Sequence, residues 1–192
     1  MKYKVFICDM TGDRCDPKEV SRQLCSEAIN TYLTMEKIES PDLPENAPVS
    51  PEDFLTEEKG KPYLKDYPVH FNVSHSGLLW LCMVGDAPCG IDIQQEKDCS
   101  FEKIAERHFN EAEQEYVKRE GIEGFFRLWT MREAYGKYTG QGFYGSMPSF
   151  IGPDGQPVKE ADGAFIHEIE IGSGIYCVCC TGGKDDRIEF IG

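Results

Sequence analysis

The chain has 192 residues, of which 40% are apolar, so it is long and apolar enough for one large domain or two small ones. No run approaches the roughly 18 consecutive apolar residues that a membrane-spanning helix needs. The formal net charge of −14 argues against nucleic acid or an anionic membrane as a partner. Asp9 ends the apolar stretch at the N-terminus before it reaches signal-peptide length, and we therefore expect a cytoplasmic protein.

Nine cysteines would suggest disulfides in a secreted protein, but their number is odd and no export signal accompanies them. Three of them, Cys177, Cys179 and Cys180, lie in an apolar run typical of a strand. We expect reduced, buried thiols.

The first part of the chain is expected to contain one helix and several strands. An apolar strand is expected at residues 2–8, and Asp16-Pro17 begins a helix that runs to about Lys37. Residues 38–70 hold six prolines and no clear period, which indicates a long irregular connection of the kind that covers a ligand. Three strands follow, at 69–74, 78–84 and 89–94, and we expect them to form an antiparallel meander.

Helices are expected next along the chain, and each has a residue that favours the start or the end of a helix. Ser100 is expected to cap a helix over residues 101–108, and Asn110 with Glu113 has the spacing of a capping box for a second helix. A third helix is expected from about Glu123 to Thr139, with Gly140 as its C-terminal stop.

The remainder of the chain, residues 148–192, reads as short strands around Phe150 and at 164–171, 175–181 and 187–191. This order of elements predicts an α+β protein, with small, mostly antiparallel sheets packed against helices. We place the division between two α+β parts after residue 88, giving parts 1–88 and 89–192.

Carboxylates and a lysine are the first candidates for chemistry. Glu133 and Lys137 are four residues apart and therefore share one face of the third helix. Asp92 and Gln94 are two apart on a strand and share one face of its sheet. Two carboxylates and an amide oxygen would suit magnesium, which takes few protein ligands and fills the rest with water and phosphate. The alternatives are an ordinary surface salt bridge on the helix and a solvated polar strand.

Two further motifs favour an anionic ligand. In Ser74-His75-Ser76, a strand end is expected to open into a loop whose hydroxyls, amides and imidazole can face a phosphate. In Gly60-Lys61-Pro62, a lysine at a turn can lie over a nucleotide. A turn histidine and a solvated basic turn are the alternatives. An anionic substrate would need a local basic patch on this acidic chain, and the candidates for it are Lys59, Lys61, Arg132 and Lys137.

Taken in order, four motifs resemble the 4'-phosphopantetheinyl transferase superfamily, in its longer pseudo-dimeric, surfactin-synthetase-activating type. They are Gly60-Lys61-Pro62, Phe71-Asn72-Val73-Ser74-His75-Ser76, Gly90-Ile91-Asp92-Ile93, and Trp129-Thr130-Met131-Arg132-Glu133-Ala134 with Lys137. The similarity extends over roughly residues 58–150. It implies two similar α+β subdomains related by a pseudo-twofold, with the metal site at their interface, in a monomer.

The resemblance also implies the reaction and its residues. Coenzyme A donates its 4'-phosphopantetheine group to a serine of an acyl or peptidyl carrier protein, with Mg²⁺, and adenosine 3',5'-bisphosphate is released. The implied metal ligands are Asp92, Gln94 and Glu133, and the implied catalytic residues are Glu133, Lys137 and His75. The implied contacts to coenzyme A are Gly60, Lys61, Pro62, Ser74, His75, Arg132, Lys137 and, on the first helix, Arg22.

This sequence departs from the family pattern in three places. Gln94 stands where many members carry a second acid, Arg132 stands where lysine is common, and the segment from Thr11 to Lys18 is short and partly acidic. Two alternatives therefore stand beside the transferase. One is a non-catalytic module that binds coenzyme A or a carrier protein, and the other is an unrelated magnesium-dependent phosphohydrolase.

Overall fold

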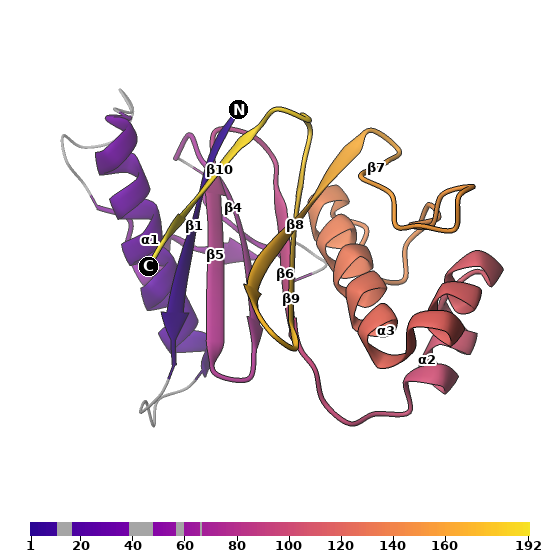
Figure 1. The fold of residues 1–192 in the computed structure, drawn as a ribbon. Helices are drawn as coiled ribbons and strands as arrows, with labels where there is room; N and C mark the ends of the chain where they lie inside the picture. Colours follow the sequence, from indigo (N-terminus) through magenta and orange to yellow (C-terminus); the bar gives the residue numbers. More distant parts are fainter. Residues whose placement is uncertain (11–16, 39–47, 57–59, 66) are drawn as a thin grey trace. The chain divides into compact units, whose positions relative to one another are not determined.

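The computed structural model describes residues 1–10, 17–38, 48–56, 60–65 and 67–192. They form two compact units, Met1–Cys89 with Asp185–Gly192, and Gly90–Lys184. Each unit combines one four-stranded sheet with helices, so the expected α+β class is confirmed (Figure 1). In the described part of the chain, no helix is both long and apolar enough to cross a membrane.

The first unit is a sheet in the order β10-β1-β5-β4, with one long helix along it (Figure 1). Ile29 and Tyr32 of the helix are almost completely buried, in one core with Trp80 and Phe71 of the sheet. All strand pairs in this sheet are antiparallel except β1 with β10. The elements are β1 (Lys2–Asp9), α1 (Pro17–Glu36), a 3-10 turn (Pro51–Asp53), β2 (Leu55–Thr56), β3 (Pro62–Tyr63), β4 (His70–Ser76), β5 (Leu79–Gly85) and β10 (Arg187–Ile191).

Two expectations about the strands of this unit were wrong. Ser74, His75 and Ser76 do not lie in a loop, because β4 continues to Ser76 and pairs with β5 as far as Leu79. The three-strand meander does not form either. Strand β5 lies between β1 and β4, and a strand has only two edges, so the next strand has no place beside it and joins another sheet.

The second unit contains a four-stranded antiparallel sheet in the order β6-β9-β8-β7, a long helix that packs against it, and a shorter helix that packs on the long one (Figure 1). Its core joins Leu128 and Met131 of the longer helix to Val178 and Ile166 of the sheet. The elements are β6 (Gly90–Gln95), α2 (Phe101–His108), α3 (Glu111–Thr139), β7 (Glu160–Ala161), β8 (Ala164–Gly172) and β9 (Ile175–Thr181).

Element α3 consists of two helical segments that meet at a sharp bend. Gly121 has φ 69° and ψ −146°, which interrupts the helix at a conformation that glycine adopts readily. Glu113 and Arg132 lie on opposite sides of the bend and form an ion pair of 3.0 Å. In a straight helix, 19 residues would separate them by about 28 Å. The two helices expected on either side of this bend are confirmed. The capping box of Asn110 and the left-handed stop at Gly140 are both present.

Two expectations for the C-terminal part need correction. Phe150 is buried but lies outside any strand, and only an isolated bridge joins Ile151 to Pro157. Strand β10 belongs to the first unit, where it pairs with β1, although the sequence placed everything after residue 88 in the second part. The buried Lys4 supports this pairing, because its ammonium lies 2.6 Å from Glu189 of β10.

Candidate functional site

The candidate site of the second unit lies where strand β6 meets the C-terminal segment of α3. Gly90 makes this contact close, since a Cβ at this position would lie 2.2 Å from the carbonyl oxygen of Ala134 and 2.5 Å from the amide nitrogen of Tyr138. Asp92 and Gln94 lie two and four residues after Gly90 on the same strand. Their side chains therefore point to the same face of the sheet, toward the helix. The glycine thus lets the helix approach the strand closely enough for its polar side chains to reach Asp92.

Asp92 is the centre of the polar contacts at this site. It is only 2% exposed, and its Oδ1 accepts a hydrogen bond of 2.7 Å from Nζ of Lys137. Its Oδ2 accepts one of 2.9 Å from Nε2 of Gln94. Lys137 also donates to the carbonyl oxygen of Ile91, at 3.1 Å. The buried carboxylate is therefore held by a cation and an amide, and Lys137 is not a solvated surface lysine.

Glu133 lies one helical turn before Lys137 and is partly buried. Burial raises the pKa of its carboxyl, the negative charge of Asp92 raises it further, and the charge of Lys137 opposes both effects. Glu133 and Asp92 are thus close enough to repel each other electrostatically. A hard cation would relieve this repulsion by binding both groups.

The chemistry of these side chains can be compared with the ligands that Mg²⁺ prefers. The described residues contain no cluster of three or more His, Cys, Asp or Glu side chains able to hold a metal. Magnesium, however, needs only one or two carboxylates when substrate phosphate and water complete its shell. The mutual repulsion of Asp92 and Glu133 fits that requirement, whereas the amide of Gln94 turns its nitrogen, and not its oxygen, toward Asp92.

In the first unit, Ser74 and His75 are adjacent residues on opposite faces of β4. Ser74 is buried, whereas His75 is exposed and lies opposite Trp80 in the register of β4 and β5. The indole nitrogen of Trp80 donates to Oγ of Ser21 on α1, at 2.9 Å. Arg22 is the next residue of α1 and is exposed. The structure therefore brings Arg22 and His75 to the same end of the sheet face that α1 covers.

The Gly60-Lys61-Pro62 motif lies near the other end of β4. Gly60 has φ 86°, and Pro62 begins the short strand β3. The pKa of His70, the first residue of β4, is lowered by burial and also by the positive charge of Lys61. Lys61 thus neighbours His70, five residues before His75, rather than His75 itself. Lys59 lies outside the described residues.

Arg132 has a different environment from the one expected of a member of an exposed basic patch. It is 7% exposed, its Nη1 lies 3.0 Å from Oε2 of Glu113, and its guanidinium lies over the rings of Phe109 and Phe143. Sequence reasoning found Glu113 only as a capping residue and missed this ion pair. The capping box was the available signal, but it carries no information about a partner 19 residues away.

Comparison with known proteins connects this geometry to a family. A model of the 4'-phosphopantetheinyl transferase superfamily matches residues 88–170, the segment that contains Asp92, Gln94, Glu133 and Lys137. The chain is 34% identical over 138 residues to the 4'-phosphopantetheinyl transferase gsp of Aneurinibacillus migulanus, an alignment that covers 67% of this chain and 57% of that protein. It is 35% identical over 144 residues to the 4'-phosphopantetheinyl transferase Sfp of Bacillus subtilis, covering 69% of this chain and 64% of the relative. The chain thus spans about six tenths of the length of these two relatives.

Proposed function

We propose that this chain, which belongs to the 4'-phosphopantetheinyl transferase superfamily, transfers the 4'-phosphopantetheine group of coenzyme A to a serine of an acyl or peptidyl carrier protein. Adenosine 3',5'-bisphosphate is the second product. The observation that carries the proposal is the cluster of Asp92, Glu133 and Lys137, which lies inside the segment matched by the family model.

The proposed reaction is a phosphoryl transfer between two oxygens. The serine oxygen attacks the phosphorus that bears the pantetheine arm, and the bond from this phosphorus to the bridging oxygen of the pyrophosphate breaks. Positioning and charge neutralisation are what a protein supplies to such a reaction. Glu133 takes the serine proton, directly or through a water that it orients, and its raised pKa makes it a better proton acceptor near neutral pH.

Lys137 carries positive charge at the same place. Its contact with Asp92 fixes the ammonium, which can then neutralise the oxygen that leaves with adenosine 3',5'-bisphosphate and donate a proton to it. Asp92 and Glu133, with Gln94 beside them, would hold Mg²⁺, which supplies neutralisation of charge on the pyrophosphate oxygens when bound. In the first unit, the proposal assigns Ser74, His75, Arg22 and the turn at Lys61 to the phosphates and nucleotide of coenzyme A.

The proposal extends to the organisation and setting of the protein. Each unit has a four-stranded sheet with one long helix packed against it, which supports two similar subdomains, and the pseudo-twofold relation and the monomeric state are part of the proposal. The eight cysteines in the described residues are free thiols, as expected in a reducing compartment, which supports a cytoplasmic location.

Mass spectrometry of an apo carrier protein tests the proposal. The protein is incubated with coenzyme A, Mg²⁺ and each of several acyl and peptidyl carriers, and the carrier is expected to gain one phosphopantetheine group on serine. Asp92→Ala and Glu133→Gln are expected to abolish the gain. Coenzyme A binding with no transfer to any carrier would favour a non-catalytic module, and release of free phosphate would favour a phosphohydrolase.

A further inference from the structure

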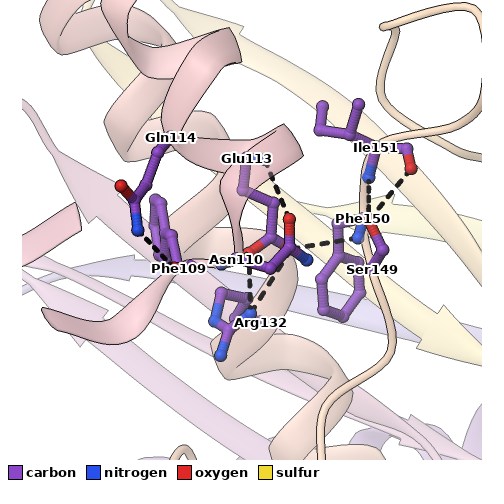
Figure 2. Close-up of polar contacts among 8 residues, drawn as sticks. All are labelled: Phe109, Asn110, Glu113, Gln114, Arg132, Ser149, Phe150 and Ile151. Atoms are coloured by element: carbon purple, nitrogen blue, oxygen red, sulfur yellow. Dashed lines mark hydrogen bonds and ion pairs between the residues drawn. The ribbon is translucent and has the colours of Figure 1, made fainter. Parts of the chain in front are cut away.

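The side chain of Glu113 is a fully buried carboxylate that contacts three separate segments of the second unit (Figure 2). Its Oε2 accepts a hydrogen bond of 3.1 Å from the backbone amide of Asn110, at the turn between α2 and α3. Its Oε1 accepts one of 3.0 Å from the backbone amide of Phe150. Both oxygens face Nη1 of Arg132, at 3.0 and 3.3 Å. A buried charge with this many partners is held in one orientation.

Arg132, the partner of Glu113 in the ion pair, is also buried. The centroids of the rings of Phe109 and Phe143 lie 5.3 and 5.5 Å from its guanidinium carbon. Its Nη1 bonds to Glu113, while its Nε is buried without a hydrogen-bond partner in the described part of the chain. Leaving this donor unsatisfied costs free energy, which the ion pair with Glu113 and the contacts with the two aromatic rings oppose.

Arg132 is adjacent to Glu133 in sequence and little more than one helical turn before Lys137. In a rigid helix, fixing the rotation at one residue fixes the direction of the next few side chains. The bend at Gly121 separates Glu113 from this segment along the chain, so the ion pair ties the segment to the first turn of α3. Glu113 is in turn hydrogen-bonded to the backbone amide of Phe150, outside both segments.

We propose that Glu113 is a positioning residue that, through Arg132, sets the rotation of the helical segment carrying Glu133 and Lys137. The catalytic consequence of this rotation rests on the proposed transferase function, whereas the rotation itself does not. Arg132 is accordingly a structural link, and its charge is directed at Glu113 rather than at a phosphate of coenzyme A.

Steady-state transfer kinetics of the full chain test the catalytic part. Glu113→Gln keeps the shape and one acceptor oxygen but removes the charge, and Arg132→Met removes the guanidinium. We expect each to lower kcat, per folded molecule, about 10- to 100-fold while changing KM for coenzyme A less than about threefold, because misplacement of reacting groups acts on the chemical step. The double variant is expected to lower kcat no further than either single change.

Two matched variants serve as controls. Glu168→Gln removes the carboxylate partner of Arg127, another arginine on the same segment of α3, and is expected to leave kcat within about twofold. Arg132→Lys keeps a cation that can reach Glu113 but loses the planar group over the two rings, and is expected to retain more activity than Arg132→Met. If Glu113→Gln does not fold, the comparison of Arg132→Lys with Arg132→Met decides the question alone.

Three kinetic results would overturn the inference. One is a folded Glu113→Gln variant with the kcat of the parent protein. Another is a double variant whose loss of kcat is the product of the two single losses. The third is an Arg132→Met variant whose KM for coenzyme A rises about tenfold at unchanged kcat, which would assign Arg132 to the ligand.

Amide hydrogen exchange tests how firmly this segment is anchored, and it requires no activity. Peptides covering residues 130–139 are expected to exchange faster in Glu113→Gln than in Glu168→Gln, at equal folded fraction, because the segment has lost its anchor. Unchanged exchange would overturn the inference even if the parent protein transfers phosphopantetheine. If the parent transfers nothing, the proposed function fails, and faster exchange would still support the positioning role.

Discussion

The ammonium of Lys137 lies 2.7 Å from a carboxylate oxygen of Asp92, although 45 residues separate them. Side-chain exposures of 27% for the lysine and 3% for the aspartate show that the pair is largely shielded from water. Its geometry follows from the close packing of β6 on α3 at Gly90. A buried carboxylate with a fixed cation beside it is the arrangement on which the proposed chemistry depends.

Lys137→Met removes the cation from this pair. We expect transfer to fall at least about 100-fold, because positive charge at the leaving group is lost. The metal-free protein is also expected to lose about 2 kcal/mol of unfolding free energy, since Asp92 keeps its buried charge without the ammonium. Transfer assays and urea denaturation measure the two effects. Lys118→Met makes the same charge change on an exposed residue of α3 and is expected to alter neither; equal behaviour of the two variants would contradict the assignment.

Glu133→Gln tests the electrostatic environment of the helix carboxylate. Its pKa in the folded, metal-free protein lies above the ordinary value of 4.5, first through burial and then through Asp92. The folded state therefore binds the proton more tightly than the unfolded state. The resulting stabilisation is complete below pH 4.5 and is lost as the pH rises through the folded pKa.

At neutral pH, Glu133→Gln is consequently expected to stabilise the metal-free protein while it abolishes transfer. Denaturation curves from pH 4 to pH 8, with chelator present, would show the difference between the variant and the parent growing with pH. A difference that is constant with pH would mean that Glu133 has the same pKa in the folded and unfolded chains. The charges that face Glu133 in this comparison are Asp92 and Lys137.

Local signals in the sequence predicted the elements better than their partners. The capping box at Asn110 and the stop at Gly140 depend on residues a few positions apart, and both were found correctly. The pairing of β6 with β9 and of β10 with β1 depends on which strand edges are already occupied. That information is distributed over the whole chain and is invisible in any one motif.

The candidate site shows the same contrast. Asp92, Glu133 and Lys137 were identified from spacing and from resemblance, and the structure brings them together within one unit. Sequence spacing paired Lys137 with Glu133 on the helix, but its short contact is with Asp92 on a strand. The ion pair of Glu113 with Arg132 was missed because the bend at Gly121 brings together two residues that are 19 positions apart. Side-chain partners across a bend follow from the fold and not from periodicity.

Gly90→Ala tests whether the close approach of β6 and α3 builds the site. The added Cβ would meet backbone atoms of the helix, at 2.2 Å from the oxygen of Ala134, so the helix must move away from the strand. We expect a loss of about 3 kcal/mol in unfolding free energy by urea denaturation, with transfer abolished in the protein that remains folded. Gly172→Ala, in the same sheet, meets only a side-chain carbon at 3.7 Å and is the matched control. Equal stability of the two variants would contradict the packing argument.

Gln94→Glu replaces the amide that donates to Asp92 by a second carboxylate on the same strand face. Without metal, the new charge faces Asp92 and Glu133 and loses the hydrogen bond, so we expect the unfolding free energy to fall by about 1 to 2 kcal/mol. With Mg²⁺, the same charge adds a ligand, so the metal concentration that gives half-maximal transfer is expected to decrease. The two effects have opposite signs, and their combination distinguishes a metal ligand from a purely structural residue.

The measurement pairs urea denaturation in chelator with a magnesium titration of transfer. Gln95→Glu introduces the same charge on the adjacent, exposed residue, whose side chain points to the other face of β6. That variant is expected to leave the magnesium titration unchanged. If Gln94→Glu lowers stability but leaves the magnesium titration where it was, Gln94 supports Asp92 without facing the metal. Increased stability in chelator would instead contradict the expected repulsion between a carboxylate at 94 and its neighbours.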